Sequence, residues 1–116
     1  MRPALDTAGE ARELDSAAGS NALDSADAVF SRLIDVIEDR RRNRPAGSYT
    51  SYLFGQGEEK IRKKTGEEAV ELILARDDAE IVHETADLVY HLLVLLCERG
   101  IGFGRILGEL ERRAGS

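Results

Sequence analysis

The chain has 116 residues, of which 42% are hydrophobic and 33% charged, and its formal net charge is −6. This length and composition are typical of a single helix-rich globular domain. The acidic balance excludes nucleic acid as the main partner because no basic face dominates. The longest apolar stretch, residues 92–97, is too short to cross a membrane. No signal-peptide pattern begins the sequence, so we expect a cytoplasmic protein.

The N-terminal segment differs in composition from the rest of the chain. Residues 1–24 are rich in Ala, Asp, Ser, Glu and Gly and contain almost no large side chains. Such a segment buries too little apolar surface to offset the entropy lost on ordering. We therefore expect a disordered tail over residues 1–24 and a folded domain over residues 25–116.

The folded part carries the periodicity of helices and no alternating strand pattern. Asp24 or Ser25 can cap the first helix, and Ser48 can cap a short second helix. The predicted helices run from about 25 to 42, 49 to 54, 58 to 76, 79 to 99 and 103 to 113. The last of them should turn Ile106, Leu107 and Leu110 inward. The sequence thus predicts an all-α fold, an antiparallel bundle of four to five helices.

In the third predicted helix, one stripe carries a charged residue among apolar ones. Its members are Ile61, Thr65, Glu68, Leu72 and Ala75. Glu68 should therefore lie in the middle of the buried face. Gly66 in the same helix costs about 1 kcal/mol relative to Ala, so we expect a neighbouring helix or a ligand to approach it closely.

The fourth predicted helix has an inner face and a polar edge. Ile81, Leu88, Leu92 and Leu95 are expected on the inner face, and Glu84, Asp87 and His91 along its edge. Residues 88–97 are apolar almost all round, with Tyr90 on the opposite flank. Because a helix of that kind is buried on more than one side, we expect the bundle to be completed by dimerisation.

Four carboxylates are placed symmetrically about the turn between these two helices. Glu71 and Glu84 are equally far from a centre midway between Asp77 and Asp78, and so are Glu68 and Asp87. Antiparallel helices pack about 8–10 Å apart, so these acids would repel one another unless a cation lies between them. All-oxygen sites suit Mg²⁺ or Mn²⁺. The alternative is a solvated acidic helix face.

Other candidates flank this acidic group. Glu67 could orient a water or act as a base, and His91 could hold a carboxylate in place by a hydrogen bond. Three lysines, Lys60, Lys63 and Lys64, could bind phosphate or form a solvated basic turn that pairs with the glutamates. Hydroxyls and amides of Ser48, Tyr49 and Thr50 could bind an anion, although a plain capping turn explains them equally well.

Two blocks resemble a known family. One comprises Ser48-Tyr49-Thr50, Gly57, Lys60-Ile61, Lys63-Lys64, Gly66-Glu67-Glu68-Ala69 and Glu71, and the other runs from Glu84 to Leu96. They resemble the phosphoribosyl-ATP pyrophosphatase family, within the MazG-like superfamily of all-α NTP pyrophosphohydrolases. The resemblance covers about residues 28–113. Thr65 stands where the family usually has Val, and the acidic tail has no counterpart.

The resemblance implies a Mg²⁺-dependent dimeric enzyme for the second step of histidine biosynthesis. It would hydrolyse 1-(5-phosphoribosyl)-ATP to 1-(5-phosphoribosyl)-AMP and pyrophosphate. In that hypothesis Glu68, Glu71, Glu84 and Asp87 hold the metal, and Glu67 or a ligand such as Glu68 takes the proton of the attacking water. The lysines, with Arg40 or Arg44, would offset phosphate charge.

Two alternatives remain open at the level of sequence. One is a house-cleaning pyrophosphohydrolase of ordinary or damaged nucleoside triphosphates, since the metal chemistry would be the same. The other is a non-catalytic helical dimerisation module whose acids bind a structural ion or only water.

Overall fold

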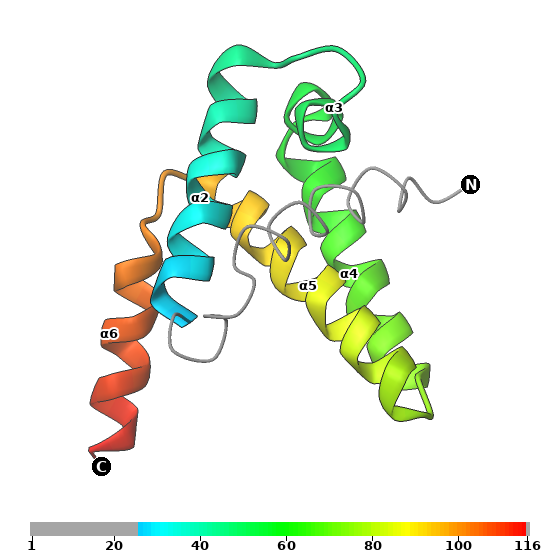
Figure 1. Cartoon of the computed structure of the whole chain (residues 1–116), viewed down its shortest axis with the longest axis vertical. Helices are drawn as coiled ribbons and strands as arrows, with labels where there is room; N and C mark the ends of the chain where they lie inside the picture. Colours follow the sequence, from blue (N-terminus) through cyan, green and yellow to red (C-terminus); the bar gives the residue numbers. More distant parts are fainter. Residues whose placement is uncertain (1–25, 116) are drawn as a thin grey trace. The chain divides into compact units, whose positions relative to one another are not determined.

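The computed structural model describes residues 26–115, and within them every regular element is a helix (Figure 1). The helices are α2 (Ala26–Asn43), α3 (Tyr49–Gln56), α4 (Glu58–Leu74), α5 (Asp78–Glu98) and α6 (Phe103–Ala114). The predicted all-α class is confirmed, with boundaries within about two residues of those expected. The predicted tail and the cap expected at Asp24 or Ser25 lie outside the described residues. None of the described helices is both long and apolar enough to cross a membrane.

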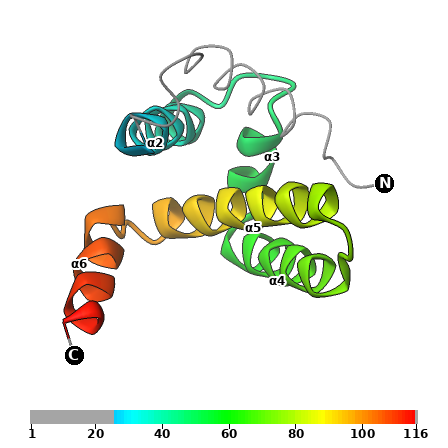
Figure 2. The ribbon, with the colours of Figure 1, turned by 60° about the horizontal axis from the view of Figure 1, so that its bottom comes forward.

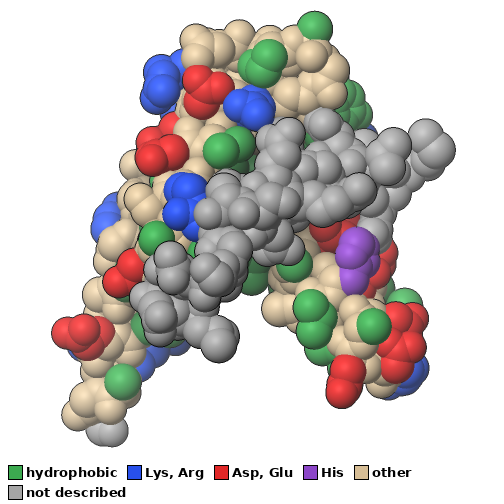
Figure 3. All heavy atoms as spheres, in the orientation of Figure 1, with side chains coloured by type: hydrophobic (Ala, Val, Ile, Leu, Met, Phe, Trp, Pro, Cys, Tyr) green, Lys and Arg blue, Asp and Glu red, His purple; other side chains and the backbone are tan. Residues whose placement is uncertain are grey.

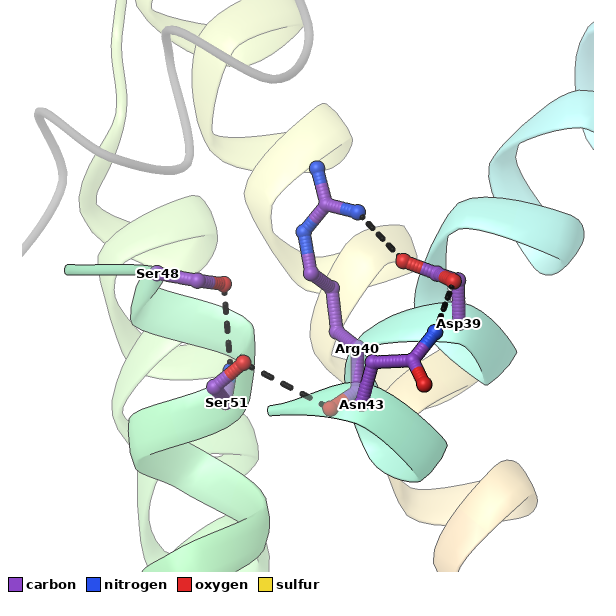
Figure 4. A network of polar contacts seen from close by, with 5 residues as sticks. All are labelled: Asp39, Arg40, Asn43, Ser48 and Ser51. Atoms are coloured by element: carbon purple, nitrogen blue, oxygen red, sulfur yellow. Dashed lines mark hydrogen bonds and ion pairs between the residues drawn. The ribbon is translucent and has the colours of Figure 1, made fainter. Parts of the chain in front are cut away.

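The chain divides after Gln56 into two compact units. In the first unit, a polar network links α2 to the start of α3 (Figure 4). The hydroxyl of Ser48 accepts a hydrogen bond from the Ser51 amide at 3.2 Å, which confirms Ser48 as the cap of α3. The Ser51 hydroxyl donates to the carbonyl of Arg40 at 3.4 Å, and Asp39 accepts from Arg40 and Asn43.

The second unit is built on a hairpin in which α4 and α5 lie side by side and antiparallel (Figures 1 and 2). Its tight turn is held by a capping box at the start of α5. The Asp77 carboxylate accepts from the Glu80 amide at 2.8 Å, and the Glu80 carboxylate accepts from the Asp77 amide at 3.2 Å. These bonds satisfy two amides that the first turn would leave unpaired, and they fix where α5 begins relative to α4.

At the opposite end of the hairpin, each of the two helices is flanked by a glycine with a positive φ, in the left-handed region of backbone conformation. Gly57, the N-cap of α4, has φ 91°, and Gly100, after the C-cap of α5, has φ 71°. A side chain would be strained at either position. The two glycines thus allow the chain to enter α4 and leave α5 by sharp turns.

Burial along α4 confirms the position expected for Glu68, which is only 1% exposed, beside Ile61 at 0%. The expectation of a helix close to Gly66 is wrong for the described chain. A Cβ added at Gly66 would meet no atom within 4 Å. Helix packing within the described chain therefore does not explain this glycine, and the approach of a ligand stays a prediction.

Burial along α5 corrects part of the expected inner face. Ile81 is 39% exposed and Leu92 is 42% exposed. Tyr90, on the opposite flank, is only 5% exposed, in agreement with the packing role expected for it. Because the second half of α5 is apolar almost all round, its periodicity does not select one face. In α6, the expected inward face is also wrong for Leu107 and Leu110, which are about half-exposed.

Candidate metal centre

Three glutamates converge between α4 and α5. Glu68 and Glu71 lie one turn apart on α4, Glu84 lies on α5, and each offers a carboxylate oxygen within 4.8 Å of the other two. Glu68 is buried and the other two are partly buried. Like charges this close raise the energy of the ionised forms, and a divalent cation among them would relieve the repulsion.

The turn explains why these residues meet. Since Asp77 caps α5 and α4 ends at Leu74, the two helices run antiparallel with almost no chain between them. Glu71 and Glu84 each lie six to seven residues, nearly two turns, from the centre of the reversal between Asp77 and Asp78, and Glu68 follows one turn beyond Glu71. The mirrored spacing in the sequence therefore brings the carboxylates of Glu68, Glu71 and Glu84 close together.

Asp87 belongs to a second, overlapping group on α5. Its carboxylate oxygen, one from Glu84 and a ring nitrogen of His83 lie within 4.8 Å of one another. His83 Nε2 is 3.4 Å from Asp87 Oδ2, and Figure 3 shows a histidine bordered by acidic side chains on the molecular surface. His83 was not among the residues expected from sequence. Its spacing of four from Asp87 is the signal that could have identified it.

Glu67 pairs with the basic turn that precedes it. Lys64 Nζ lies 3.1 Å from Glu67 Oε1, and the lysine side chain is only 12% exposed. The hydrogen bond from Lys64 is the largest cause that lowers the pKa of Glu67, and the charges of Lys64, Lys63 and Lys60 add to it. At neutral pH Glu67 is thus an ionised carboxylate, able to accept a proton, next to three cationic side chains.

His91 is buried, at 2% exposure, one turn beyond Asp87. Its Nδ1 lies 2.7 Å from the main-chain oxygen of Asp87. Since a carbonyl oxygen only accepts, Nδ1 carries the proton in this contact. The ring also packs edge-on against Tyr90, with centroids 5.7 Å apart. This nitrogen therefore contacts the peptide of Asp87, and the expected bond to a carboxylate stays a prediction.

The hydroxyl-bearing residues of the resemblance lie in the first unit. Ser48 caps α3, and Tyr49 and Thr50 are 4% and 0% exposed. Tyr49 stacks on Tyr52 with ring centroids 6.2 Å apart. A capping and packing role accounts for the contacts seen, and anion binding by these residues stays a prediction.

The donor set fits a divalent ion. Four of the five side chains in the two groups offer carboxylate oxygens, which Mg²⁺ and Mn²⁺ prefer, and the fifth offers an imidazole nitrogen. An all-α hairpin that gathers acids in this way is the arrangement of a helical hydrolase of phosphoanhydrides.

Comparisons with known proteins identify the family within this class. A family model described as Phosphoribosyl-ATP pyrophosphohydrolase matches residues 30–114. A phosphoribosyl-ATP pyrophosphatase of Pelotomaculum thermopropionicum is 55% identical over 73% of this chain and 90% of its own length. One from Lactiplantibacillus plantarum is 50% identical over 72% of this chain and 81% of its own length. The chain belongs to the phosphoribosyl-ATP pyrophosphohydrolase family.

Some relatives are longer proteins. The histidine biosynthesis bifunctional protein HisIE of Pyrococcus furiosus is 45% identical over 78% of this chain. This chain covers only 44% of that relative. The similarity is therefore to one part of the bifunctional protein.

Proposed function

We propose that this chain hydrolyses 1-(5-phosphoribosyl)-ATP to 1-(5-phosphoribosyl)-AMP and pyrophosphate in histidine biosynthesis. Family membership supports the substrate, since relatives about half identical to the chain are named for it. The observation that carries the chemistry is the convergence of Glu68, Glu71 and Glu84 within 4.8 Å. Such a group can hold the cation that a polyphosphate substrate requires.

Mg²⁺ is the proposed ion, with Mn²⁺ as a substitute, and Asp87 adds a fourth carboxylate to the centre, beside Glu84. When bound, the ion supplies charge neutralisation for the phosphates and lowers the pKa of a coordinated water. Glu68, Glu71 and Glu84 would hold the ion between the two helices. The requirement for oxygen donors supports Mg²⁺ over softer ions for this set.

Glu67 is the proposed proton acceptor, because it is an ionised carboxylate next in sequence to Glu68, although the lowered pKa that Lys64 gives it makes it a weaker base than an unpaired glutamate. Glu68 is the second candidate for this role. Hydrolysis at the α–β linkage releases pyrophosphate, and Lys60, Lys63 and Lys64 would offset the charge that develops on it. Ser48, Tyr49 and Thr50 are proposed to bind phosphate, and Arg40 or Arg44 to offset phosphate charge.

The test is a pyrophosphate-release assay with purified protein. Phosphoribosyl-ATP should be turned over with Mg²⁺, and the rate should be lost with EDTA. Glu68→Gln and Glu84→Gln should each lower kcat at least about a hundredfold, since each removes a charged ligand. Glu59→Gln is the matched control, because Glu59 is an exposed acid on the same helix.

A panel of NTPs and dNTPs in the same assay tests the substrate. Turnover of the panel without turnover of phosphoribosyl-ATP would overturn the proposal in favour of a house-cleaning enzyme. No turnover of any nucleotide, with the variants as well folded as the parent, would favour a non-catalytic module.

We also propose that the chain forms a homodimer. In the single chain, α4 and α5 leave large apolar side chains exposed, including Ile73 at 71%, Val82 at 69% and Leu92 at 42%. Burial of such residues against a second copy would stabilise the pair. Light scattering should give twice the chain mass, and Leu92→Glu should shift it towards the monomer. A monomeric parent would contradict the proposal.

A further inference from the structure

We infer that His83 is a metal ligand. With Glu84 and Asp87 it forms a second cation position, next to the one between Glu68, Glu71 and Glu84, and this position takes a first-row transition ion. The inference rests on the proposed function, because it extends the same centre. It adds a residue that neither the carboxylate pattern nor the names of the relatives point to.

The spacing along α5 brings the three donors to one place. His83 and Asp87 are four residues apart and Glu84 and Asp87 are three apart, so Asp87 lies one turn below both. His83 Nε2 is 3.4 Å from Asp87 Oδ2. Two donors that each lie about 2.1 Å from one ion are about 3 to 4 Å apart, and this nitrogen–oxygen separation is in that range.

Glu84 connects the two positions. It is the one residue common to both groups of donors, and a carboxylate has two oxygens. Glu84 can therefore bridge two ions, as in sites where two metals about 3.5–4 Å apart act on one phosphate group. The first position would have only oxygen donors from the protein, and the second would have two oxygens and one nitrogen.

That difference in donors predicts a difference in preference. Mg²⁺ favours oxygen donors, whereas an imidazole nitrogen favours first-row transition ions. The His83 side chain is 52% exposed and the Asp87 side chain only 9% exposed. An ion from solvent can thus reach the nitrogen while Asp87 presents its oxygen from the interior side.

The two histidines of the chain can be separated by experiment. Tag-free protein is loaded with Mn²⁺ and examined by pulsed electron paramagnetic resonance, which detects a ¹⁴N nucleus bonded to the ion. The parent should show a histidine nitrogen signal, and His83→Gln should bind Mn²⁺ without it. His83→Asn serves as the second variant. Isotherms with Co²⁺ and with Mg²⁺ should show at least about a tenfold loss of Co²⁺ affinity in the variant and little change for Mg²⁺.

The outcomes distinguish this inference from the proposed function. Two bound Mn²⁺ ions per chain without any nitrogen signal in the parent would overturn the role of His83 and leave the carboxylate centre standing. A signal that persists in both variants would assign the nitrogen to His91 and also overturn it. If the parent binds no Mn²⁺, the metal centre of the proposed function fails, and this inference fails with it.

Discussion

Arg99, which ends α5, reaches back to Glu58, the first residue of α4. The Arg99 Nη1 lies 3.3 Å from Glu58 Oε2, and the Arg62 Nε donates to the same oxygen at 2.7 Å. The Arg99–Glu58 contact joins the two helices at the open end of the hairpin, whereas the capping box fixes the start of α5 at the turn. Along the hairpin, the carboxylates of the metal centre lie between the Arg99–Glu58 contact and the capping box.

The first prediction concerns pH. The hydrogen bond from Arg62, with the charges of Arg99 and Arg62, lowers the pKa of Glu58 from 4.5. A carboxyl with a lowered pKa in the folded state stabilises the protein above its unfolded pKa, and that contribution is lost as the pH falls through the folded pKa. Glu58→Gln should therefore lower Tm at pH 7, and the difference from the parent should shrink below pH 4.5.

Glu59→Gln is the control for this experiment, because Glu59 shares the first turn of α4 and hence the interaction with the helix dipole. The effect at Glu58 should exceed that at Glu59. Equal effects of the two variants would show that the contacts with the arginines contribute nothing beyond the dipole.

The second prediction concerns the cap of α5. Asp77→Ala removes the acceptor for the Glu80 amide and should cost about 1 kcal/mol, which corresponds to a fall in Tm of about 4–8 °C. Asp78→Ala removes a neighbouring carboxylate from the same turn and should cost less, because Asp78 is not the cap. Thermal denaturation measures Tm for the two variants. A larger fall in Tm for Asp78→Ala than for Asp77→Ala would contradict the assignment of Asp77 as the cap.

The third prediction concerns Gly66. An alanine there meets no atom within 4 Å in the described chain, and alanine is favoured over glycine inside a helix by about 0.8–1.0 kcal/mol. Gly66→Ala should therefore raise the free energy of unfolding by about that amount, measured by urea denaturation. A decrease would show that a second copy of the chain, or some other group, approaches this position.

The fourth prediction concerns the repulsion among the buried acids. Glu68→Gln removes one charge from a group of three that lie within 4.8 Å, so the metal-free variant should have a higher Tm than the metal-free parent. At about one hundred times its Kd, a ligand stabilises the folded state by about 2.7 kcal/mol. At that concentration, Mg²⁺ should raise the free energy of unfolding of the parent by about 2.7 kcal/mol. It should raise that of the variant much less. Equal shifts would contradict a role for Glu68 in holding the ion.

Much of the hairpin could be predicted from sequence, because its signals are local. The helical period placed Glu68 on a buried stripe, and the short break at residues 76–78 predicted the antiparallel return. Cap chemistry decides such turns within a few residues. The antiparallel return then predicted that the acids at mirrored positions, such as Glu71 and Glu84, lie close together.

The remainder depends on contacts that sequence periodicity does not contain. Residues 88–97 are apolar almost all round, so the pattern could not tell that Leu92, expected on the inner face, is exposed. His83 carries only one signal in the sequence, its spacing of four from Asp87, and that spacing is equally typical of an ion pair on a solvated helix face. The approach of its nitrogen to Asp87 and its grouping with Glu84 in the structure single it out.

The most direct measurement is an anomalous difference map from a crystal soaked in Mn²⁺. The account predicts a peak between the carboxylate oxygens of Glu68, Glu71 and Glu84, with α4 and α5 paired as they are here. A map with no peak among these side chains, or one in which they turn away from one another into solvent, would contradict it.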